Sequence, residues 1–173
     1  PRIATTKKIK TNESINSISY TGFVKLNLDP LTFKAQGVFG SNLADQLMLG
    51  GYAVKTLDTL SGFEEYTALK CFSVWGEISI GKDIEYAVFA GYTKNLAADK
   101  NIAGSYYRRG INIEKVFRVS PRVQFNFGKT RISTEFEYTT AGYGLPDNTN
   151  KGKVENAKEF SNMRLIAAVI YFF

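Results

Sequence analysis

The feature that most constrains the fold is the last segment, Leu165–Phe173, which is apolar throughout and ends on an aromatic residue. Counted back from the end, every second residue is apolar: Phe173, Tyr171, Val169, Ala167, Leu165 and Met163. Because successive side chains of a strand point to opposite faces, this spacing builds one continuous apolar face with aromatic rings at its foot. Such a face suits contact with lipid. The alternative is a buried terminal strand of a soluble β-sandwich, which is apolar as well.

The same alternation recurs upstream and favours the lipid-facing interpretation. Between 116 and 127, one face holds Phe117, Val119, Pro121, Val123, Phe125 and Phe127, and the other holds Arg118, Ser120, Arg122, Gln124 and Asn126. The next segment sets Ile132, Phe136 and Tyr138 against Arg131, Ser133, Glu135, Glu137 and Thr139. Two faces of such different polarity indicate a sheet with lipid on one side and water on the other.

Short and long connections alternate along the chain. Short turns are predicted at Asp29-Pro30, Gly81-Lys82-Asp83 and Gly128-Lys129-Thr130, each between two alternating segments, as in a β-hairpin. Long polar stretches, expected to be loops, run from about 41 to 66, 94 to 115 and 143 to 161. The expected strands are Ser17–Leu28, Leu31–Gly40, Thr67–Ile80, Ile84–Thr93, Val116–Phe127, Arg131–Ala141 and Asn162–Phe173, with an eighth candidate of poor alternation between Ile3 and Lys10.

Composition excludes several other classes of protein. The longest uninterrupted apolar run is Leu165–Phe173, whereas a transmembrane helix needs about 20 such residues. The absence of histidine removes Ser-His hydrolytic arrangements and the commonest metal ligand, so neither an enzyme nor a cofactor is expected. The single cysteine, Cys71, excludes an internal disulfide. The formal charge of +6 is scattered without a basic helix or patch, so no nucleic-acid partner is expected.

These patterns predict an all-β fold, a transmembrane antiparallel β-barrel with seven to eight strands in this chain. One outer-membrane barrel domain is expected to span 1–173. Because the chain starts at Pro1 without an apolar signal region, we expect either a processed precursor or the C-terminal half of a longer barrel. Half a barrel leaves two bare strand edges, which lipid cannot satisfy, so it needs the remaining strands.

The face opposite the apolar one carries ten charged side chains that we expect to line a pore. They are Lys25, Lys34, Arg118, Arg122, Arg131, Arg164, Glu77, Glu85, Glu135 and Glu137. So many charges cannot form a dry core, because each unpaired buried charge costs several kcal/mol. Their basic excess would favour anionic or zwitterionic solutes. The alternative is that they solvate the wall and pair with each other.

A few other residues are candidate sites. Glu135 and Glu137 have the spacing of paired carboxylates, but no pocket or partner supports catalysis. The loop 145–150 offers oxygen ligands for Ca²⁺, although an ordinary turn fits it better. Arg108-Arg109 either contacts lipopolysaccharide phosphate or sits in a solvated loop. Trp75 falls on the inner face, where it plugs the lumen or stacks on a ligand, unless a bulge shifts the register.

Residues 113–129, Ile132–Tyr138 and the terminal Tyr171-Phe172-Phe173 resemble the C-terminal part of porin-like proteins from Bacteroidota outer membranes, which are similar to the DcaP-type porins. The resemblance implies a barrel of about sixteen strands that is commonly trimeric and passes small solutes by diffusion. This chain is too short for such a barrel, and the resemblance therefore also implies that it is a C-terminal half.

The expected function is an outer-membrane porin with a water-filled channel for passive diffusion of small solutes. Its expected partners are outer-membrane lipid and lipopolysaccharide, small solutes, a homotrimer and the barrel-assembly machinery, which would read the assembly signal Phe173, Tyr171 and Val169. One alternative is a closed eight-stranded outer-membrane barrel with a structural or adhesion role, filled by side chains. A second is a soluble lipocalin-like ligand-binding barrel, which inverts the pattern to apolar inside.

Overall fold

The computed structural model describes residues 2–3, 10–11 and 13–173, and the described chain is all-β apart from one short 3₁₀-helix, η1 (Leu43–Gln46). Its strands are β1 (Arg2–Ile3), β2 (Lys10–Thr11), β3 (Ser19–Leu28), β4 (Leu31–Ser41), β5 (Gly50–Leu57), β6 (Glu64–Ile80), β7 (Ile84–Ala98), β8 (Tyr106–Arg109), β9 (Ile113–Phe127), β10 (Thr130–Asp147) and β11 (Lys153–Tyr171). The predicted all-β class is thereby confirmed. The expected strand between Ile3 and Lys10 lies largely outside the described residues.

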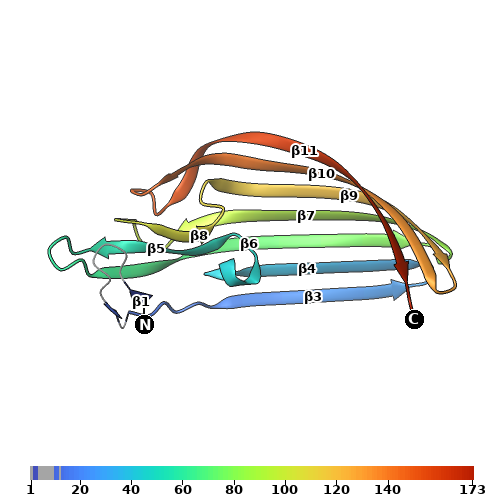
Figure 1. Cartoon of the computed structure of the whole chain (residues 1–173), viewed down its shortest axis with the longest axis horizontal. Helices are drawn as coiled ribbons and strands as arrows, with labels where there is room; N and C mark the ends of the chain where they lie inside the picture. The colour runs from blue at the N-terminus through green and yellow to red at the C-terminus, as the bar shows by residue number, and fades with distance from the viewer. Residues whose placement is uncertain (1, 4–9, 12) are drawn as a thin grey trace.

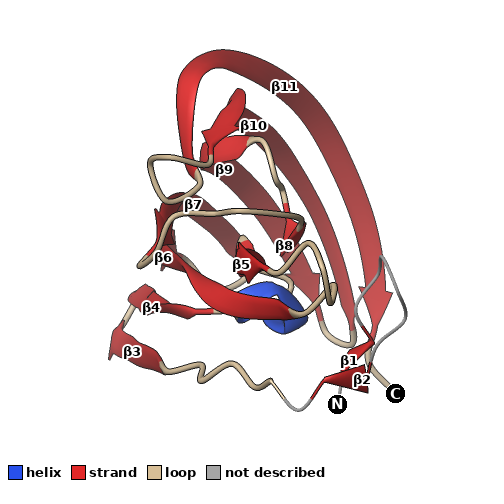
Figure 2. Ribbon diagram, turned by 90° about the vertical axis from the view of Figure 1, so that its left-hand side faces the viewer, coloured by secondary structure: helices blue, strands red, loops and turns tan. Residues whose placement is uncertain are grey.

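One antiparallel sheet contains every strand from β3 onward (Figure 1). Its main order is β11-β10-β9-β7-β6-β4-β3, while β5 pairs with β6, and β8 pairs with β5. The three predicted hairpins are confirmed, since β3–β4, β6–β7 and β9–β10 each turn at the expected residues. The sheet curves but does not close in the described chain, because β3 and β11 each have one partner and do not pair together (Figure 2).

The prediction of three long polar loops was wrong. β5 and β8 lie inside the first two stretches, and β10 and β11 extend through most of the third. β5 lacks the alternation that marks a half-buried strand because half of its residues, Gly50, Gly51, Ala53 and Val54, are buried and lie on both faces. β8 has only four residues, too few for a periodic pattern. Within these stretches, β6 and β11 hold polar residues on both faces and β10 holds a glycine and a proline, so alternation disappears there while pairing continues.

Two regions can be distinguished along the strands. The wall comprises 19–41, 70–94, 115–142 and 159–171, which include the three short hairpins. The cap comprises 42–69, 95–114 and 143–158, at the opposite end of the sheet, where η1, β5 and β8 lie on its concave side (Figure 2). No helix among the described residues is long and apolar enough to cross a membrane.

The hydrophobic core lies in the cap. One cluster joins Ala53, Leu69, Ala98 and Ile102, with Tyr106 packed against it. A second joins Leu43 and Leu49 to Cys71, with Val38, Met48 and Ile113 packed against it. Val38 and Cys71 project from the concave face of the wall, so the second cluster fastens the cap onto that face.

The convex face of the wall is apolar and exposed. Strand pairing aligns residues of neighbouring strands in rows across the sheet, for example Leu26, Phe33, Ile78, Val88 and Pro121. Counted along the strands from the short hairpins, the first charged residues on this face are Lys94, Lys115 and Glu159. Between Glu159 and the end of β11, this face carries Ser161, Met163, Leu165, Ala167, Val169 and Tyr171. At about 3.3 Å per residue, the charge-free stretch from Ser161 to Tyr171 extends about 33 Å along β11.

Candidate functional site

The ten predicted lining charges come from seven neighbouring strands and share the concave face. Strand pairing sets Lys25 opposite Lys34 and Lys34 opposite Glu77 on the β3, β4 and β6 side. On the other side it sets Arg122 opposite Glu135 and Glu137 opposite Arg164. Because paired residues of antiparallel strands project from the same face, the predicted register is confirmed along the wall. Most of the charges lie in the half of the wall nearer the short hairpins, and Glu85 and Arg131 are the second residues of β7 and β10.

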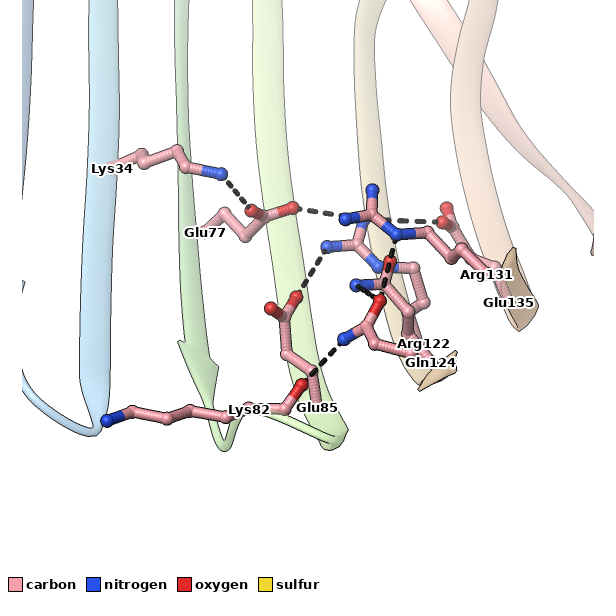
Figure 3. Close-up of polar contacts among 9 residues, drawn as sticks. Lys34, Glu77, Lys82, Glu85, Arg122, Gln124, Arg131 and Glu135 are labelled. Atoms are coloured by element: carbon pink, nitrogen blue, oxygen red, sulfur yellow. Dashed lines mark hydrogen bonds and ion pairs between the residues drawn. The ribbon is translucent and has the colours of Figure 1, made fainter. Parts of the chain in front are cut away.

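Arg122 is the centre of the larger ion network (Figure 3). Its guanidinium nitrogens lie 3.2 Å from Glu77, 3.6 Å from Glu85 and 3.9 Å from Glu135. Glu77 in turn accepts a 2.8 Å hydrogen bond from Lys34 Nζ. Arg122 of β9 reaches Glu77 of β6 across β7, where its register partner is the buried Ala87. The network therefore joins β4, β6, β7, β9 and β10 through side chains alone.

A second network is built around Glu137, whose side chain is only 8% exposed. Its Oε1 lies 3.1 Å from Arg118 Nη1, and its Oε2 accepts a 2.6 Å hydrogen bond from Arg164 Nε. Arg118 Nε also donates to Thr139 Oγ1 at 3.0 Å. Two guanidinium groups thus share one buried carboxylate, which leaves this network with one excess positive charge.

Arg131 and Lys25 have no carboxylate partner among the described residues. Arg131 Nε donates to Asn126 Oδ1 at 3.0 Å, and its guanidinium lies 5.3 Å from the ring centroid of Phe172. Lys25 is exposed and faces another lysine, Lys34, across the β3–β4 hairpin. The other eight predicted charges are ion-paired, so the expected mutual pairing holds for most of the ten charges. Glu135 and Glu137 are engaged by arginines, which leaves neither as a free acid or base.

Aromatic residues on the concave face were only partly found from the sequence. Trp75 lies on this face as predicted, and its pairing with Gln36 shows no bulge at that position. Phe23 and Phe89 flank it, with ring centroids 6.2 Å and 5.9 Å from that of Trp75. Both occupy positions that alternation assigns to the polar face. An aromatic residue at a position of the polar face is the sequence signal from which Phe23 and Phe89 could have been predicted.

The 145–150 loop, the candidate calcium site in the cap, is organised around Asp147. Asp147 accepts hydrogen bonds from the Thr149 hydroxyl at 2.7 Å and the Thr149 amide at 2.8 Å, and these bonds lower the pKa of Asp147. The 145–150 segment thus forms an ordinary turn. No cluster of metal-ligating side chains occurs in the described part of the chain.

The expectation that Arg108-Arg109 is a solvated pair was wrong for Arg108. Its three guanidinium nitrogens are buried without a hydrogen-bond partner in the described residues, and its guanidinium lies 4.8 Å from the Tyr106 ring centroid. Burial lowers the pKa of Arg108 to about 10. Arg109 is exposed. β8 turns Arg108 inward because its pairing with β5 places Arg108 opposite Gly51.

The predicted assembly residues lie on or beyond β11. Val169 and Tyr171 project from the convex face and are 73% and 56% exposed. β11 ends at Tyr171, and Phe173 follows it with its ring packed against that of Tyr171 at 5.6 Å between centroids. Phe172 points the other way, toward Arg131.

Comparisons of the chain with protein-family models, curated proteins and solved structures find no match.

Proposed function

We propose that this chain forms part of an outer-membrane porin, in which the concave face of the wall lines a water-filled channel for passive diffusion of small solutes. The observation that carries the proposal is the division of the wall into an exposed apolar convex face and a charged concave face. Lipid on one side and water on the other make both faces favourable. A soluble protein would have to expose the whole apolar face to water.

The dimensions and rims of the convex face support a membrane position. At the tilt of about 45° that strands have in outer-membrane barrels, the charge-free rows would cover about 25 Å, which matches the apolar band of those barrels. Aromatic side chains gather near both limits of this band, with Tyr20, Phe39, Phe72, Tyr92 and Phe117 toward the cap and Tyr86, Phe125, Phe127 and Tyr171 toward the hairpins. The ion pair of Lys82 and Asp29, at 2.9 Å, joins two hairpin turns beyond the band.

Further strands are required to close the barrel. The outer edges of β3 and β11 have no partner among the described residues, and bare strand edges are costly in lipid. We propose that strands outside this segment pair with both edges and complete a larger porin, as the resemblance of residues 113–138 to porin-like proteins implies. That resemblance adds a homotrimer, lipopolysaccharide contacts and assembly by the barrel-assembly machinery to the proposal.

A closed eight-stranded barrel with a structural or adhesion role is the second candidate. It is favoured by one observation, the close pairing of most charges on the concave face, which a barrel filled by side chains needs. The open sheet favours the porin, because a small barrel would bring β11 close to the first strands. The lipocalin-like alternative is disfavoured, since its apolar face would be the concave one.

We expect a channel lined by this wall to pass anions slightly better than cations. Six basic and four acidic side chains leave two excess positive charges, and Lys25 and Arg131 have no carboxylate partner in the described chain. Charges that are not neutralised locally set the field inside a pore. We therefore expect Lys25→Glu to shift the reversal potential in a KCl gradient toward cations more than Arg122→Gln does.

Conductance in planar bilayers tests the proposal, using protein extracted from its native membrane so that the whole barrel is present. Large stepwise openings are expected for a porin. Correctly inserted protein that remains silent would reject the channel and support the filled barrel. Deletion of Phe173 is expected to reduce assembly into the membrane, and normal insertion of the shortened protein would remove its role as a signal.

A further inference from the structure

The concave wall carries one apolar cluster among its charges. Trp75 of β6 lies between Phe23 of β3 and Phe89 of β7, and all three rings occupy positions on the water-facing side. Phe23 is 59% exposed, and the rings of Trp75 and Phe89 are partly exposed. Exposed aromatic rings gathered within a polar surface mark a place where a ligand makes contact.

The rings are held in place by their neighbours. Trp75 Nε1 donates to Gln36 Oε1 at 2.9 Å, and Gln36 Nε2 donates to Thr21 Oγ1 at 3.3 Å. Gly91 is the register partner of Trp75, and a Cβ at Gly91 would lie 3.0 Å from Phe89 Cζ. The missing side chain therefore gives the Phe89 ring room to lie against the backbone. A surface held in this way loses little conformational freedom when a ligand binds.

Polar groups border the rings on both sides. A hollow of about 210 Å³ is lined by Trp75, Phe89, Gly91, Thr93 and Arg118. Arg118 uses Nε on Thr139 and Nη1 on Glu137, which leaves its Nη2 for a ligand. Arg118 shares Glu137 with Arg164, so its charge is partly offset, and its Nη2 offers a hydrogen-bond donor to a neutral ligand. On the same side as Arg118, the Thr93 hydroxyl donates to the Phe72 carbonyl at 3.0 Å and can accept a hydrogen bond from a ligand, and on the other side the Gln36 amide can both donate and accept.

We propose that this aromatic cluster binds the apolar C–H face of a sugar ring, so that the channel has a subsite for neutral saccharides. A pyranose offers a flat face of C–H groups to the electron-rich faces of the rings, and its edge carries hydroxyls for Thr93, Gln36 and Arg118. A planar aromatic anion would need an unpaired cation beside the rings, and Arg118 is already paired. This inference rests on the proposed function, because the sugar reaches the cluster through the water-filled lumen.

The experiment uses the intrinsic fluorescence of Trp75, the sole tryptophan of these 173 residues, in the detergent-solubilised native protein. The difference in emission between wild type and Trp75→Phe is followed during titration with maltotriose. A saturable change is expected with maltotriose and none with sorbitol, which has no ring. Phe89→Leu is expected to weaken the binding about tenfold. An emission that stays constant with maltotriose, or that saturates with benzoate instead, would overturn the proposal.

Two further variants separate binding from folding. Phe23→Leu changes an exposed ring of the same cluster and should also weaken maltotriose binding, whereas Phe136→Leu on the convex face should leave it unchanged. Equal losses in Phe23→Leu and Phe136→Leu would reject the site. Bilayer recordings on the same preparation separate the two proposals: conductance without a maltotriose response rejects the sugar subsite alone, and a maltotriose response without conductance supports the subsite but rejects the channel.

Discussion

The wall and the cap belong to one sheet, yet they are stabilised in opposite ways. Nearly all of the buried apolar residues in the described chain lie in the cap, and the exceptions are Cys71 and Ala87. In the wall the buried residues are mostly polar, such as Ser120, Gln124 and Glu137. The cap is thus built like a small water-soluble domain, whereas the wall is apolar outside and polar inside.

Backbone geometry follows the same division. Every register shift lies in the cap or at its border, at Val54/Thr56, Leu69/Cys71, Gly142/Tyr143 and Tyr143/Leu145. The non-glycine residues with positive φ also lie in the cap: Asn42, Leu47, Ala97, Lys151 and Asn156. A one-residue slip in the wall would exchange its apolar and charged faces. The cap, in which β5 is buried on both faces, has no such division.

The largest effect is expected from a cavity in the cap. Leu69 is fully buried against Ala53, Ala98 and Ile102, so Leu69→Ala should cost about 2–5 kcal/mol of cap stability. Hydrogen exchange of the β5 amides would measure this loss. Leu26→Ala in the wall removes a side chain that is 48% exposed and should cost much less in detergent. Equal costs would mean that the cap has no core of its own.

Charge insertion tests the two faces of the wall at adjacent positions. Leu165→Arg places a cation in the middle of the convex band and should cost about 2–4 kcal/mol on insertion into lipid vesicles. Ile166→Arg is the matched control, because Ile166 projects from the concave face opposite Glu135. If both variants insert equally well, the convex face does not meet lipid.

Glu137 is the most buried carboxylate among the ten lining charges and should be the most sensitive to neutralisation. Glu137→Gln leaves Arg118 and Arg164 without their shared partner and should destabilise the wall by about 1–3 kcal/mol, measured by thermal unfolding in detergent. Glu135→Gln is the comparison, since Glu135 is 27% exposed and lies 3.9 Å from Arg122. A larger loss for Glu135→Gln would contradict the assigned networks.

Arg108 offers a substitution that should stabilise the cap. Its guanidinium is buried without a partner in the described chain, so Arg108→Met replaces a costly charge by an apolar side chain of similar length. We expect a gain of about 1 kcal/mol, detected as slower exchange of the β8 amides. The exposed Arg109→Met should leave exchange unchanged. Destabilisation by Arg108→Met would indicate that the guanidinium has a partner in the assembled protein.

The smallest effect is expected from acidification of the 145–150 turn. The pKa of Asp147 is lowered by its bonds to Thr149, so the carboxylate stabilises the turn above its unfolded pKa near 4. This contribution is lost as the pH falls through the lower folded pKa. The Thr149 amide should therefore exchange faster, relative to its intrinsic rate, once the pH has fallen through this lowered pKa. Asp147→Asn should remove the pH dependence, and its persistence in that variant would exclude Asp147 as the cause.

The sequence predicts the wall well because one physical rule governs it. Alternation sets every side chain of Val116–Phe127 on its observed face, and the three short hairpins fix the pairing. The cap could not be predicted in this way. β5 is buried on both faces, and β8 exists only because β5 lies beside it, so neither has a periodic pattern. The ion pairs could not all be predicted either, since Glu77, the carboxylate nearest to Arg122, lies two strands away from it.

The reach of Arg122 across β7 has a mechanical consequence. Strands β6 and β9 share no backbone hydrogen bonds, yet Arg122 and Glu77 connect them over the short side chain of Ala87. Both side chains project from the concave face, so flattening of the sheet would move them apart. The ion pair therefore resists flattening. The curvature of the sheet therefore depends partly on the small side chain of Ala87. A longer side chain at this position would separate Arg122 from Glu77 and allow the sheet to flatten.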